Sequence, residues 1–209
     1  MSLSRYHQKR NFESTAEPKG KEEESKSELI FVVQKHDASR LHYDFRLELD
    51  GVLKSWAIPK GPSMNPEGKR LAVMVEDHPY DYKDFEGNIS EGNYGAGNVI
   101  VWDNGTYTAS NATGNEDVKK NIQAGLEKGH LAIHLSGKKL KGEFDLIRLH
   151  GKQENAWLLI KKKDTYANDG DVLTNEKSVI SDKTLEILNK QSPKEKSTKK
   201  KKPAKKRAD

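Results

Sequence analysis

Residues 34–49 read QKHDASRLHYDFRLEL, and this stretch carries the strongest signal for the fold. Side chains of a β-strand point alternately to its two faces, so the second half of the stretch divides cleanly. The apolar face holds Tyr43, Phe45, Leu47 and Leu49. The polar face holds His42, Asp44, Arg46 and Glu48. The pattern predicts a strand that is anchored in a core by one face and presents ionisable groups on the other.

The polar face also indicates a chemistry. His42 and Asp44, with His36 six residues before His42, offer neutral imidazole and carboxylate ligands, which suit a divalent transition ion. Arg46 shares their face, and a guanidinium beside a metal suits a phosphate bound to that ion. The combination favours metal-assisted chemistry on a phosphate ester, with a surface salt-bridge patch as the alternative.

Short β-type runs continue along most of the chain. Besides 42–49, they cover residues 30–34, 52–58, 70–75, 98–102, 105–108, 130–135, 142–148 and 157–161. Asp50-Gly51 is a tight-turn signal between two of them. Helices are expected only near 115–125, ending close to Gly125 or Gly129, and over 181–189. Many short, closely spaced strands predict a mainly β protein, an antiparallel barrel or sandwich with one or two short helices.

Charge is distributed unevenly over the 209 residues. The net charge is +5, yet Lys190 to Asp209 alone hold ten Lys or Arg and two acidic residues, so the rest of the chain is net negative. This tail cannot bury enough apolar surface to fold, and a basic tail can contact nucleic-acid phosphates without sequence preference. It indicates a polyanionic partner; a solubilising terminus is the alternative.

Composition excludes several classes of protein. There is no cysteine, which removes disulfides, thiolate metal sites and cysteine nucleophiles. No stretch approaches the ~18 consecutive apolar residues of a membrane span, and the first residues lack the apolar core of a signal peptide. We expect a monomeric, cytoplasmic protein without a membrane partner.

Several ungapped blocks resemble a known family. They are residues 34–46, 50–62, 69–79, 91–97 and 126–131, followed by the strand that contains Trp157. Together they closely resemble the 3′-phosphoesterase domain of bacterial DNA ligase D and its stand-alone relatives, over roughly residues 5–165. The resemblance implies a compact β-barrel over 29–165, preceded by a polar arm over 1–28 that partly reaches the site. A linker with a short helix (166–189) and a disordered basic tail (190–209) would follow.

The resemblance also implies site roles. A Mn²⁺ ion, or another divalent transition ion, would be held by His36, His42 and Asp44. Phosphate contacts and catalysis would fall to Arg46, Lys60, Arg70 and His78, with Arg10 of the arm as a further phosphate contact. Gln34, Glu76, Tyr82 and Asn11 would support the site. Apart from the resemblance, His78 is also the natural candidate to protonate a leaving alkoxide or to hydrogen-bond the phosphate.

The family trims DNA or RNA-tipped DNA 3′ ends. It removes a terminal nucleoside and then the 3′-phosphate, leaving a 3′-OH, and a separate DNA ligase and polymerase would be expected to complete the repair. One departure concerns the arm, where the family carries an Arg-Asp pair and this chain has Arg10-Asn11. An amide cannot act as a base, so we expect nucleoside removal to be weaker here than phosphate removal.

Two other functions remain open on the residues alone. A non-haem iron oxygenase also uses His-x-Asp and a second His on a β-barrel, but that second His usually lies far downstream. A catalytically silent module could bind nucleic acid or a repair partner through its barrel and tail. Oxoacid-dependent turnover would favour the first, and absence of any turnover the second.

Overall fold

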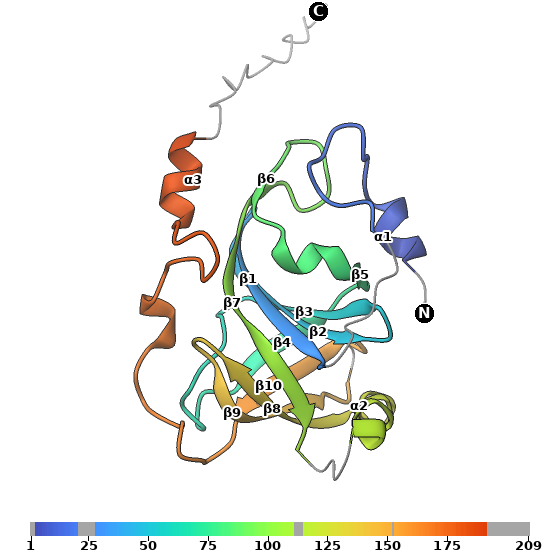
Figure 1. The fold of residues 1–209 in the computed structure, drawn as a ribbon, viewed down its shortest axis with the longest axis vertical. Coiled ribbons are helices and arrows are strands. Elements are labelled where there is room, and N and C mark those ends of the chain that lie inside the picture. The colour runs from blue at the N-terminus through green and yellow to red at the C-terminus, as the bar shows by residue number, and fades with distance from the viewer. Residues whose placement is uncertain (1–2, 21–27, 111–114, 152, 192–209) are drawn as a thin grey trace, which may run out of the picture.

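The computed structural model describes residues 3–20, 28–110, 115–151 and 153–191, and it is mainly β (Figure 1). Within these residues, eight antiparallel strands close a barrel in the order β1-β2-β3-β4-β10-β9-β8-β7, because β7 pairs back onto β1. The strands are β1 (Ile30–Asp37), β2 (Leu41–Leu49), β3 (Val52–Ile58), β4 (Arg70–Met74), β7 (Gly97–Ala109), β8 (His130–Gly137), β9 (Lys141–Arg148) and β10 (Ala156–Lys161). The predicted β-barrel is confirmed.

Each expected strand is present, with small shifts at its ends. The runs 98–102 and 105–108 join into the long strand β7, since Asp103 and Asn104 continue the ladder with β1. Two very short strands were not predicted: β5 (His78–Pro79) pairs with β3, and β6 (Gly87–Ile89) pairs with β7. Strands of two or three residues are too short to show an alternation.

The predicted turn after β2 is a two-residue hairpin turn. Leu49 pairs with Val52, and between them Asp50 and Gly51 have φ values of 51° and 78°. Two successive residues with positive φ are what a type I′ hairpin requires, and glycine adopts this conformation without steric cost. This turn sets the register of β2 against β3.

Three α-helices lie within the described residues, together with two 3₁₀ helices, η1 (Tyr80–Asp84) and η2 (Val172–Thr174). α2 (Asn115–Lys128) starts as expected and ends before Gly129, whose φ is 78°. α3 (Leu185–Gln191) begins later than the predicted residue 181, because Asp182 has a φ of 60° and cannot be helical. α1 (Ser4–Gln8) in the N-terminal arm was not predicted.

Buried apolar side chains form two layers on either side of the barrel wall. The inner layer contains the whole predicted apolar face of β2 and large side chains such as Trp56 and Trp157. A smaller outer layer is made by Tyr6, Val32, Leu53, Tyr82 and Val101. Burying one such side chain contributes about 1.5–3 kcal/mol to stability. The outer layer docks α1 and η1 against β1, β3 and β7 (Figure 1), so the polar face of β2, which pairs with β1 and β3, lies between two packed layers.

The structure describes only part of the N-terminal arm and of the C-terminal tail. The disordered tail predicted for 190–209 falls, apart from its first two residues, outside the described residues, as do residues 21–27 of the arm. Residues 3–20 are described, and both Tyr6 and Glu17 of this part are buried. No helix in the described ranges combines the length and apolar character that a membrane-spanning helix requires.

Candidate active site

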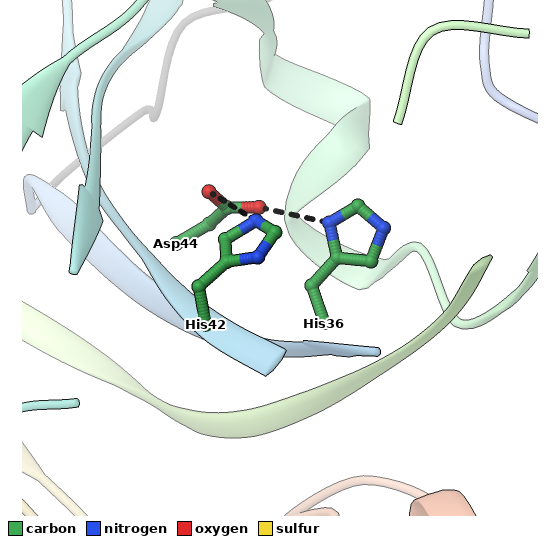
Figure 2. Close-up of side chains that lie close together, drawn as sticks. All are labelled: His36, His42 and Asp44. Carbon is green, nitrogen blue, oxygen red and sulfur yellow. Dashed lines mark ion pairs between the residues drawn. The ribbon is translucent and has the colours of Figure 1, made fainter. Parts of the chain in front are cut away.

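The predicted metal ligands come together near the loop that joins β1 to β2. His36 and His42 lie directly opposite each other in the antiparallel register, and Asp44 follows on the same face of β2. Asp44 Oδ2 lies 3.6 Å from His36 Nδ1, and Asp44 Oδ1 lies 3.7 Å from His42 Nε2 (Figure 2). Metal–ligand distances of ~2.1 Å place two ligands of one ion roughly 3 to 4 Å apart. The spacing therefore suits one ion shared by all three residues.

Both imidazoles are oriented by backbone carbonyls. His36 donates from Nε2 to the carbonyl of Gly95 at 2.8 Å, and His42 donates from Nδ1 to the carbonyl of Arg40 at 2.9 Å. Each ring thereby keeps the nitrogen that faces Asp44 unprotonated and available as a ligand. Two neutral imidazoles and a carboxylate fit a divalent transition ion. This is the only group of three such ligands among the residues whose placement is described.

Arg46 is buried behind the ligands and held on three sides. Its Nε donates to Gln34 Oε1 at 2.8 Å, its Nη1 to Ser55 Oγ at 2.8 Å and its Nη2 to Asp44 Oδ2 at 3.1 Å. A guanidinium has five N–H groups, so two of them remain for a phosphate. Burial alone would raise the pKa of Asp44, but the adjacent Arg46 guanidinium outweighs burial and holds that pKa well below its usual value. Asp44 is therefore ionised and ready to bind a cation.

The N-terminal arm inserts a second guanidinium into the same site. Arg10 donates from Nε to Glu17 Oε1 at 2.9 Å and from Nη1 to Glu76 Oε1 at 3.1 Å. Glu17 also accepts a hydrogen bond from the Tyr82 hydroxyl at 2.9 Å. Burial raises the pKa of Tyr82 well above its usual value, so the hydroxyl stays protonated and can donate. These contacts bind the arm to the barrel across more than sixty positions of sequence.

The imidazole of His78 is neutral, and both of its ring nitrogens form hydrogen bonds. Its Nδ1 donates to the carbonyl of Glu76 at 3.0 Å, and its Nε2 accepts from Arg10 Nη2 at 3.1 Å. Burial, Arg46 and Arg10 hold the pKa of His78 well below its usual value. In this arrangement the imidazole of His78 positions Arg10, and its Nε2, which faces the guanidinium, carries no proton.

The predicted site residues divide into three groups by position. A cavity of about 270 Å³ is lined by His36, His42, Asp44, Arg46, His78 and Arg10, and also by Glu76 and Tyr82. Gln34 lies behind Arg46, where its amide nitrogen donates to the carbonyls of Tyr82 and Phe85. Asn11 does not line the cavity, because its Oδ1 accepts from the backbone N–H of Glu13.

Lys60 and Arg70 are not brought to this cavity. Lys60 lines a separate hollow of about 350 Å³ together with Lys35 and Glu176. Arg70 lies at the start of β4, and its alternation with Val73 directs it to the strand face opposite the one that adjoins the site. Their role as phosphate contacts stays a prediction that this geometry does not support.

Sequence reasoning missed three participants. Ser55 lies opposite Arg46 in the β2–β3 register, and a small polar residue beside Trp56 in a strand that is apolar apart from Lys54 was a signal that could have revealed it. Glu17 lies in an arm whose sequence shows no hydrophobic periodicity. The Gly95 group that takes part is a backbone carbonyl, which every residue has, so the residue type does not indicate its role. For these two, no local signal exists.

Glu17 provides a test of how the arm is held. Replacing it with alanine leaves the buried Arg10 guanidinium and the Tyr82 hydroxyl without their acceptor. Removing one partner of a buried ion pair is strongly destabilising, so we expect Glu17→Ala to lower the free energy of unfolding by about 3 kcal/mol. Urea denaturation checks this. Glu13→Ala, an exposed position in the same arm, is the matched control, and an equal effect of both variants would contradict the prediction.

Comparison with known proteins places this geometry in a family. The family model of the DNA ligase D 3′-phosphoesterase domain matches residues 34–148. The multifunctional non-homologous end joining protein LigD of Pseudomonas aeruginosa is 54% identical over 191 residues, covering 88% of this chain and 22% of that protein. The corresponding DNA repair protein LigD of Mycobacterium tuberculosis is 41% identical over 163 residues, covering 78% of this chain and 20% of that protein.

The chain thus spans about a fifth of the length of these relatives. The matched residues 34–148 make up more than half of the chain and include the three metal-type ligands, Arg46 and His78. The chain belongs to the family of DNA ligase D 3′-phosphoesterase domains.

Proposed function

We propose that this chain is a divalent-metal-dependent phosphoesterase that removes 3′-phosphates and 3′-terminal ribonucleosides from DNA ends and leaves a 3′-OH. The observation that carries the proposal is the convergence of His36, His42 and Asp44 on one cavity that also contains the guanidinium groups of Arg10 and Arg46. A cation site flanked by two guanidinium groups suits a phosphate ester, whereas a generic oxygenase has no use for them.

The relatives' printed names extend the proposal to a setting. Both are named as multifunctional non-homologous end joining proteins. We propose that this chain acts in the same process, preparing DNA ends for a ligase and a polymerase, with Mn²⁺ as its ion. Family membership and the donor set support this choice, since imidazole and carboxylate ligands suit Mn²⁺ among other divalent ions.

The residues of the chain would share the work as follows. His36, His42 and Asp44 hold the ion, which when bound supplies a Lewis acid and lowers the pKa of a bound water. Arg46 directs its two unused N–H groups toward phosphate oxygens that gather negative charge in the transition state. Because Asp44, Gln34 and Ser55 hold Arg46 in place, this positive charge is oriented before substrate arrives.

His78 acts in this proposal by positioning Arg10. Its Nε2 accepts from Arg10, and its lowered pKa keeps the ring neutral near pH 7. A role in protonating the leaving alkoxide would require the ring to gain a proton in a cavity that already contains two guanidinium groups. Hydrogen bonding and positioning therefore fit the geometry better than proton donation.

A direct assay tests the proposed function. A 5′-labelled primer–template that ends in a 3′-phosphate or in one 3′-ribonucleotide is incubated with metal-free protein, with and without Mn²⁺. We expect the 3′-phosphate to be converted to 3′-OH only when the ion is present. No conversion with any divalent ion would overturn the proposal in favour of a silent binding module.

The Arg10-Asn11 departure gives a prediction about the two reaction steps. We expect Asn11→Asp to raise the rate of ribonucleoside removal relative to phosphate removal, because a carboxylate beside Arg10 can act as a base and an amide cannot. Aspartate can also accept the hydrogen bond from the Glu13 backbone, which should keep the fold of the arm, and its side chain must exchange this bond for one in the cavity to act as a base. Rates on both substrates are compared in the two proteins. An unchanged ratio would show that position 11 does not limit the first step.

A further inference from the structure

A larger groove continues from the metal-binding cavity. Its volume is about 810 Å³, three times that of the cavity at about 270 Å³. Val75, Glu76 and Tyr94 line both, so the two spaces adjoin along this shared edge. Ligand pockets typically measure about 300–1,000 Å³. The small cavity is therefore suited to the terminal group of a substrate, and the groove has room for the rest of the substrate molecule.

The groove is lined by basic side chains from distant parts of the chain. Arg5 and Lys9 come from the N-terminal arm, Lys54 from β3 and Arg148 from β9. The helices α1 and α2, both on the right of Figure 1, each contribute side chains to its lining. The groove walls thus bring together four cations that are unrelated in sequence.

Three acidic residues also line the groove, and Lys54 pairs with Asp77 at 2.7 Å, so the excess of positive charge is small and is carried by Arg5 and Arg148. Glu76 already accepts from Lys9 and from Arg10, and Arg10 is not a groove residue. Glu127 and Glu154 are exposed at the rim. Arginines such as Arg5 and Arg148, placed along one path, commonly contact a sugar–phosphate backbone.

Tyr94 stands on the shared edge and is exposed, with 56% of its surface accessible. The Lys9 ammonium lies 4.4 Å from the centre of its ring. The next residue, Gly95, has a φ of 79° and accepts the hydrogen bond of the metal ligand His36. The loop that orients this ligand therefore also sets the position of an open aromatic ring at the mouth of the cavity.

A substrate 3′ end is the end of a chain, so the strand that precedes it must leave the small cavity. We propose that the strand leads away along the groove, with the base next to the 3′ end stacked on Tyr94 and the strand's sugar–phosphate backbone contacting Arg5 and Arg148. This inference rests on the proposed function, because it assigns the substrate of the same site. Aromatic side chains provide such stacking for any base, which suits an enzyme that acts on ends of any sequence.

Equilibrium binding tests the role of Tyr94 without turnover. The probe is a primer–template that ends in a 3′-OH and carries 2-aminopurine as its terminal primer base, so no phosphoesterase step can consume it. We expect Tyr94→Ala to raise the dissociation constant about tenfold, within the roughly 5- to 150-fold span of base–aromatic stacking. It should also abolish quenching of the 2-aminopurine fluorescence. Tyr94→Phe should behave like the wild type, because the ring is kept.

Tyr166→Ala is the matched control for Tyr94→Ala. Tyr166 is 47% exposed and lines neither the groove nor the cavity. The proposal would be overturned if the dissociation constants of Tyr94→Ala and Tyr166→Ala agreed within twofold. It would also be overturned by a Tyr94→Ala protein that loses activity on a small ester such as para-nitrophenyl phosphate, since that loss would indicate a disturbed metal site and no strand contact.

The basic residues are tested by the salt dependence of the same binding. Each phosphate contact removed should flatten the slope of log affinity against log salt by about 0.7 to 0.9. We expect this for Arg5→Gln and for Arg148→Gln, and no change for Lys177→Gln, which lies in the C-terminal segment outside the groove. Equal slopes in all variants would overturn the proposed path. Phosphate release by the wild type is measured separately, so a failure of the proposed function is distinguishable from a failure of this inference.

Discussion

His42→Ala is expected to abolish both metal binding and phosphate release. His42 is one of the three ligands that we propose among the described residues, and its Nε2 lies 3.7 Å from Asp44 Oδ1. Mutation of residues that only hydrogen-bond to the ligands typically lowers metal affinity about 10- to 100-fold. Loss of a ligand itself should therefore lower the affinity by more than about 100-fold. Calorimetric titration with Mn²⁺ and the 3′-phosphate assay measure the two effects in one protein.

Thermal unfolding gives a readout of this prediction that is independent of activity. An ion that binds only the folded state at 100 times its dissociation constant adds about 2.7 kcal/mol of stability. We expect Mn²⁺ to raise the melting temperature of the wild type and to leave that of His42→Ala unchanged. His130→Ala, at an exposed histidine paired with Asp145, should keep the full response to Mn²⁺. An equal response of His42→Ala would remove His42 from the ligand set.

Arg46→Ala is expected to have the second largest effect, on stability and on catalysis together. The buried guanidinium donates to Gln34 Oε1, Ser55 Oγ and Asp44 Oδ2, and its loss removes the donor that each of these buried oxygens accepts from. Breaking a buried ion pair from one side costs about 3–5 kcal/mol of stability. Loss of a positive group aimed at the transition state costs about 10² to 10³ in rate. Urea denaturation and single-turnover phosphate release measure the two quantities.

Two further variants separate these effects. Arg46→Lys keeps the charge but cannot make three bonds in a plane, so it should recover part of the rate and little of the stability. Arg40→Ala changes an exposed arginine in the neighbouring loop and should affect neither. Rates are compared at a temperature where circular dichroism shows all proteins folded. A normal rate in folded Arg46→Ala would exclude Arg46 from transition-state stabilisation.

Alternation along β2 made much of the site predictable. The apolar face of the strand is inside the barrel, and the predicted ligands share the other face. The Asp50-Gly51 turn was predictable for a related reason, since positive φ values are tied to particular residue types. In both cases the information is local, because strand geometry and turn conformation depend on a few neighbouring residues.

The remaining parts of the site depend on contacts between distant residues. Arg10 meets Glu76 and His78 across 66 and 68 positions, and Glu17 meets Tyr82 across 65. The arm has no periodicity that could predict its docking. Lys60 shows the opposite case: its local setting at a stiff corner suggested a site residue, yet the chain direction after β3 carries it to another hollow. Residue types alone cannot distinguish these outcomes.

The sequence by itself determined the β architecture, the inward face of β2, the three metal-type ligands and the neighbouring guanidinium. Only the tertiary structure decided that the arm brings Arg10 to His78, that both histidine ligands are oriented by carbonyls, and that a groove adjoins the cavity. The physical reason is the range of the interactions. Strand alternation is a property of adjacent peptide units, whereas the burial that docks the arm and forms the groove exists only after the barrel has closed.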